Sequence, residues 1–158
     1  MAEKKREKRF GRKYREKKRE ERKVARAAED KANEGPRELD AQMEPLRDHM
    51  LAKPGCVEEY PFGPQAMVFK VAGKMFGLLA WEEVPVSISL KCDPERSLEL
   101  REEHEGINGA YHMNKKHWHS VAMGDSVDMV LVRELMDHSY ELVIATLPGK
   151  ERERLQGL

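Results

Sequence analysis

The densest run of functional side chains outside the N-terminal segment spans residues 109–119. Two adjacent lysines and an amide, Asn114, Lys115 and Lys116, stand between two short strand-like stretches, so we expect them at the exposed tip of a hairpin. Ammonium and amide groups on an exposed element are suitable donors to phosphate oxygens. The tip is therefore a candidate phosphate-binding site, to which His117 could add a contact.

The same run could instead hold a metal ion, because it contains three of the six histidines, His112, His117 and His119. His117 and His119 alternate along an expected strand, so both could lie on one face and chelate a metal. His112 would face His117 across the hairpin. A zinc site would need further ligands, and no cysteine pair stands nearby. We expect no metal and no cofactor.

Motifs for catalysis are missing from the sequence. It has no Gly-x-Ser-x-Gly elbow, no phosphate-cradling glycine loop, no His-Glu-x-x-His and no dinucleotide fingerprint. His138 and Ser139 are adjacent in an expected helix, so their side chains point apart. His138 lies on the apolar stripe of that helix, where we expect a core histidine that is hydrogen-bonded to a buried partner. We therefore expect a protein that is not an enzyme.

Charge divides the chain in two. Residues 1–35 contain 15 Lys or Arg and 8 Asp or Glu, a balance of +7, whereas residues 36–158 contain 14 and 21, a balance of −7. The first segment has too few apolar residues to offset the entropy of ordering it, so residues 1–36 are expected to form a disordered or transiently helical basic tail. Such a tail could bind DNA, RNA or an acidic protein, or could serve only solubility. The acidic remainder argues against a strong general attraction for nucleic acid.

The other bulk features point to the cytoplasm. The two cysteines, Cys56 and Cys92, are too few for a disulfide framework and are expected to be reduced. No apolar run approaches the roughly 18 residues of a membrane span. The charged N-terminus lacks the apolar core of a secretory signal.

Hydrophobic periodicity predicts a helix over residues 39–52, strands over 67–71, 75–81 and 86–92, a helix over 93–104, two short strands around the tip, and a last helix beginning near residue 124. The segment 56–64 is expected to be a rigid turn, and residues 150–158 a short charged end. Antiparallel strands covered on one face by helices make an α+β two-layer sandwich, which is the fold class expected for residues 37–149.

Three stretches resemble motifs of the MmcQ/YjbR family. Tyr111–Trp118 resembles the central motif, and Glu59–Gly63 and Asp137–Val143 resemble those that flank it, in the same order. The resemblance covers roughly residues 39–147. It implies a frataxin-like (CyaY-like) α+β fold and DNA binding, without established catalytic residues. The frataxin likeness also suggests iron on the carboxylates of the first helix, which are Glu38, Asp40, Glu44 and Asp48, but these are spread out and acidic helix faces are usually solvated.

The leading hypothesis is a DNA-binding protein that contacts phosphates through the tip and the tail. The alternative is a protein-interaction or small-ligand module that uses a groove between Tyr60, Phe62 and Trp118. We expect Trp118 to be buried against the sheet or the last helix. Carboxylates around Lys115 would argue against phosphate binding, so the surroundings of this lysine distinguish the two hypotheses.

Overall fold

The computed structural model of the protein describes residues 16–27, 41–80, 85–110, 113–124 and 126–158. The chain divides into two compact units, Met1–Glu34 and Gly35–Leu158. In the first unit, residues 16–27 form a helix whose side chains are all exposed. No described helix combines the length and apolar character needed to cross a membrane.

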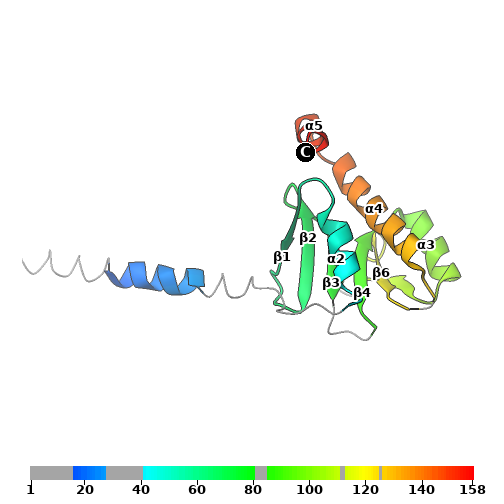
Figure 1. Ribbon diagram of the computed structural model, residues 1–158, viewed down its shortest axis with the longest axis horizontal. Coiled ribbons are helices and arrows are strands. Elements are labelled where there is room, and N and C mark those ends of the chain that lie inside the picture. The colour runs from blue at the N-terminus through cyan, green and yellow to red at the C-terminus, as the bar shows by residue number, and fades with distance from the viewer. Residues whose placement is uncertain (1–15, 28–40, 81–84, 111–112, 125) are drawn as a thin grey trace, which may run out of the picture. The chain divides into compact units, whose positions relative to one another are not determined.

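The second unit is built on an antiparallel sheet of six strands (Figure 1). The strands are β1 (Cys56–Glu59), β2 (Ala66–Val71), β3 (Lys74–Ala80), β4 (Ser87–Lys91), β5 (Ile107–Gly109) and β6 (Trp118–Ala122). Their order across the sheet is β1-β2-β3-β4-β6-β5, so only the last pair is reversed relative to the sequence. The helix α3 (Pro94–Glu103) makes the connection that allows this reversal.

Helices cover one face of the sheet. Gly77, Leu90 and His119 stand opposite one another on β3, β4 and β6, so they share that face. A Cβ at Gly77 would lie 2.2 Å from the Met50 methyl group of α2 (Glu44–Leu51), so a larger residue here would have to displace the end of the Met50 side chain. Ser97 of α3 contacts His119 at 3.4 Å, and α4 (Met129–Ala145) packs across β2, β3 and β4. The α+β two-layer sandwich predicted from the sequence is confirmed.

Local sequence signals explain where the helices begin. The Asp93 carboxylate accepts hydrogen bonds from the N–H groups of Glu95 and Arg96, and Pro94 takes the first helical position of α3. The helix predicted over residues 93–104 is confirmed. Pro45 lies at the beginning of α2, which therefore starts later than residue 39.

Two elements were missed by the sequence analysis. The segment expected to be a turn begins with the edge strand β1, which pairs with β2. The expected charged end forms a helix, α5 (Gly149–Gln156), and its Leu155 is buried in the core. Both elements carry too few apolar residues to show a period.

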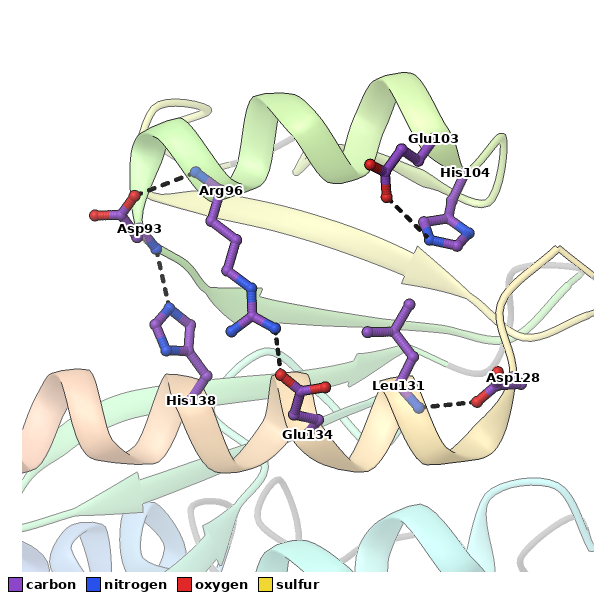
Figure 2. Close-up of polar contacts among 8 residues, drawn as sticks. All are labelled: Asp93, Arg96, Glu103, His104, Asp128, Leu131, Glu134 and His138. Carbon is purple, nitrogen blue, oxygen red and sulfur yellow. Dashed lines mark hydrogen bonds and ion pairs between the residues drawn. The ribbon is translucent and has the colours of Figure 1, made fainter.

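Four consecutive residues of α4 attach it to different parts of the fold. Asp137 forms an ion pair with Lys53, just after α2, and a hydrogen bond with Nε2 of His49 in α2 at 2.7 Å. Burial raises the pKa of its carboxyl, but hydrogen bonds from Lys53 and His49 outweigh this and lower the pKa overall. His138 accepts a hydrogen bond from the N–H of Asp93 at 3.2 Å, at the start of α3 (Figure 2).

The next two residues hold α4 to the sheet and to the turn after α2. The Ser139 hydroxyl donates to the Phe76 carbonyl of β3 at 2.5 Å and accepts from the Lys91 N–H of β4 at 2.9 Å. The Tyr140 hydroxyl donates to the Pro54 carbonyl at 2.6 Å, and its ring packs edge-on against Phe76. Ser139 is fully buried whereas His138 is half-buried. The prediction of a core histidine at position 138 was therefore wrong, because α4 turns Ser139 toward the sheet instead.

We expect Ser139→Ala to lower the free energy of unfolding by about 2–4 kcal/mol, because the buried Phe76 carbonyl and the part-buried Lys91 N–H lose their partner. Chemical denaturation measures this loss. Ser89→Ala, on the opposite face of β4, is the matched control. A loss no larger than that of the control would contradict the bridging role of the hydroxyl.

Candidate nucleic-acid interface

The predicted tip is a turn that connects β5 to β6. The carbonyl of Asn114 accepts hydrogen bonds from the N–H groups of Trp118 at 2.9 Å and His117 at 3.2 Å. Its side-chain oxygen accepts from the N–H of Lys116 at 2.9 Å. Asn114 therefore shapes the turn through its two oxygens, and its side-chain amide N–H2 group can donate to a ligand.

Arg101 of α3 fixes the turn through hydrogen bonds to its main chain. Its Nη2 donates to the carbonyls of Lys115 at 2.5 Å and Trp118 at 3.2 Å. The sequence analysis missed this role because Arg101 stands in a mostly charged helix. A usable signal was its spacing of four from Ser97, which places both residues on the same face of α3.

The four predicted site residues, Asn114, Lys115, Lys116 and His117, are brought together on this turn, and all four are exposed. Among the described residues, no carboxylate lies within ion-pair distance of Lys115 or Lys116. The stem of Lys115 lies against Gly109, with methylene carbons 3.2–3.3 Å from the position a Cβ would take there. Arg101 is on the same side, so two cations lie close together.

Acidic side chains limit the field around this turn. The exposed surface of α3 carries four carboxylates, which belong to Glu95, Glu99, Glu102 and Glu103. Residues 36–158 also have a balance of −7. The turn can therefore supply a few positioned contacts but no broad positive surface.

Trp118 is 8% exposed and lies opposite Lys91, whose ammonium is 5.6 Å from the ring centre. The expected burial of Trp118 is confirmed. The predicted groove is not formed, because Tyr60 directly follows β1 and three strands separate β1 from β6. Tyr60 is itself buried, whereas Phe62 is 62% exposed.

The histidine pair proposed as a chelate is also separated. His117 lies in the exposed turn before β6, whereas His119 is completely buried in that strand. His112 lies outside the described residues. Within the described part of the chain, no three His, Cys, Asp or Glu side chains are grouped so that they could hold a metal ion.

An open pocket of about 520 Å³ lies between α2 and α4. Its lining includes Glu44 and Asp48, two of the carboxylates considered for iron, together with His49 and Arg133. Glu38 and Asp40 lie outside the described residues. The lining mixes both charges, and it shares no residue with the turn.

Comparison with known proteins identifies the family. The sequence model described as YjbR matches residues 51–142, which include β1 to β6 and most of α4. The chain belongs to the YjbR family. The central turn and the Asp137–Tyr140 segment of α4 both lie within the matched region.

Relatives within the YjbR family include two Escherichia coli proteins, both named as uncharacterized. YbdF of strain O157:H7 is 39% identical over 97 residues, which is 61% of this chain and 80% of YbdF. YjbR of strain K12 is 30% identical over 110 residues, which is 70% of this chain and 93% of YjbR.

Two crystal structures resemble the fold. A Deinococcus radiodurans protein with a DUF419 domain has a TM-score of 0.67 and 38% identity, and the match covers 72% of this chain and 87% of that protein. A Pseudomonas syringae protein has a TM-score of 0.56 and 27% identity, with 66% and 98% covered.

His119 makes stability depend on pH. Burial, followed by the nearby charge of Arg101, lowers its pKa from 6.5 to about 4. Its Nδ1 contacts the Ser97 hydroxyl, but its Nε2 is buried without a partner among the described residues. The unfolded chain therefore takes up a proton as the pH falls below 6.5, while the folded chain stays neutral until about pH 4.

We expect this histidine to account for about 2 kcal/mol of the stability lost between about pH 7 and pH 5. His119→Asn removes the titrating group, so its free energy of unfolding should fall less over the same interval, whatever its value at neutral pH. Urea unfolding at both pH values measures the difference. His117→Asn, on the exposed turn, is the control, and equal pH dependence in both variants and the parent would contradict the assignment.

Proposed function

We propose that this member of the YjbR family is a non-enzymatic, cytoplasmic DNA-binding protein that contacts backbone phosphates. The observation that carries the proposal is the turn at residues 114–117. It is shaped by Asn114, held by Arg101, and presents Lys115 and Lys116 without a carboxylate partner among the described residues. Exposed, positioned cations of this kind fix the register of a protein on the phosphate backbone.

The two basic parts of the chain contribute differently to DNA binding. The turn has few charges in fixed places, so it sets orientation more than strength. The unit Met1–Glu34 has a large excess of basic residues, and each phosphate that they neutralise releases counterions and adds affinity. Base reading is not part of the proposal, because phosphate contacts carry no direct sequence information.

The test is the salt dependence of binding to duplex DNA. Lys115→Ala combined with Lys116→Ala should lower the magnitude of the log–log salt slope by no more than about two, since each lost contact removes roughly 0.9. Deletion of residues 1–34 should lower it by more. Fluorescence anisotropy with a labelled duplex gives both slopes.

The matched control is Lys150→Ala with Arg152→Ala, two exposed cations on α5. This control should bind as the parent does. If it weakens binding as much as the turn variant, the turn has no special role. If the parent binds single-stranded RNA or an acidic protein but not duplex DNA, the proposed partner is wrong.

A further inference from the structure

The helix at residues 16–27 separates its charges into opposite sides. A helix turns once per 3.6 residues, so residues four apart stack in one row along its surface. One row holds only basic residues, which are Lys18, Arg22 and Arg26. The adjacent row holds Arg19, Lys23 and Ala27. The three glutamates of the segment, Glu16, Glu20 and Glu21, all fall in the other two rows.

Five cations therefore share one exposed face. Lys18, at the border of that face, forms an ion pair with Glu21 at 3.4 Å, and both side chains are at least half exposed. Exposed pairs of this kind contribute little and exchange readily for a stronger anion. The segment has no apolar stripe, so charge is the one feature that its helical form organises.

We propose that this basic face, formed by Lys18, Arg19, Arg22, Lys23 and Arg26, lies along the backbone of duplex DNA. The inference rests on the proposed function and goes further by giving the tail a defined geometry. Residues 18, 22 and 26 rise by about 6 Å at each step and by about 12 Å in all. Duplex DNA carries one phosphate per roughly 1.7 Å of its axis, so about seven phosphates lie within that span.

A duplex is favoured over a single strand because its phosphates hold fixed positions. Cations in a fixed row gain most when the anions they face are equally fixed. A flexible single strand adapts to any arrangement of the same charges, and it also releases fewer counterions for each contact. Arrangement on the helix should therefore matter for duplex DNA and much less for single-stranded DNA.

The experiment compares two triple variants of the full chain with equal loss of charge. The face variant carries Lys18→Ala, Arg22→Ala and Arg26→Ala. The matched control carries Lys4→Ala, Lys5→Ala and Arg6→Ala in the same tail. Alanine favours helix, so the face variant should keep its helical content, which circular dichroism checks.

Binding to a duplex and to a single strand of the same sequence is measured at about 50 and 200 mM salt. For the duplex, affinity falls as salt rises from the lower to the higher concentration. Three lost contacts should make this fall about 40-fold smaller in the face variant than in the parent. The control should retain most of the drop. For the single strand, the two variants should behave alike.

Equal losses for the two variants on duplex DNA would overturn the inference, because charge alone would then explain the tail. If the two variants differ in affinity for single-stranded DNA as much as they differ for duplex DNA, the inference that the ligand is a duplex is wrong. A parent that binds duplex DNA in either case leaves the proposed function standing. A parent that binds neither form of DNA, but binds an acidic protein, would overturn both proposals.

Discussion

One hydroxyl group on α4 completes the hydrogen bonding of the sheet. Ser139 inserts between the Phe76 carbonyl and the Lys91 N–H, just beyond the last pair formed by β3 and β4. A buried serine can do this because it donates and accepts through the same atom. Its neighbours attach α4 to α2, to α3 and to the turn after α2. Four consecutive residues therefore fix the position of the helix layer relative to the sheet.

The same contacts continue from α4 and the sheet to the candidate interface. Lys91, whose N–H reaches Ser139, stands opposite Trp118 at the foot of the turn. The next residue, Cys92, donates its N–H to the His117 carbonyl at 2.9 Å. Arg101 then holds the turn from α3, which Arg96 connects to Glu134 of α4 (Figure 2). The position of Lys115 and Lys116 is thus connected to α4 through this series of contacts, although no described residue of α4 forms an ion pair or a side-chain hydrogen bond with either lysine.

The sequence predicted those elements whose apolar or capping residues recur at regular positions. Alternating residues gave β2, β3 and β4, and an Asp-Pro pair gave the start of α3. It did not predict two elements that lack such spacing: β1 has no apolar alternation, and Leu155 is the one buried residue of α5. The rotation of α4 was missed because a small polar residue, Ser139, takes the buried position. Arg101 was missed because its partners are carbonyls distant in sequence.

The tail shows the difference between composition and position. Counting charges gives its balance of +7, and a search for apolar periodicity finds nothing in it. The spacing of Lys18, Arg22 and Arg26 is nevertheless readable from the sequence, provided that charge is tested for the helical period as well. The turn and the helix then place their cations by different means. Hydrogen bonds fix the two lysines of the turn, whereas in residues 16–27 the 3.6-residue period of the helix aligns five cations without a folded core to support them.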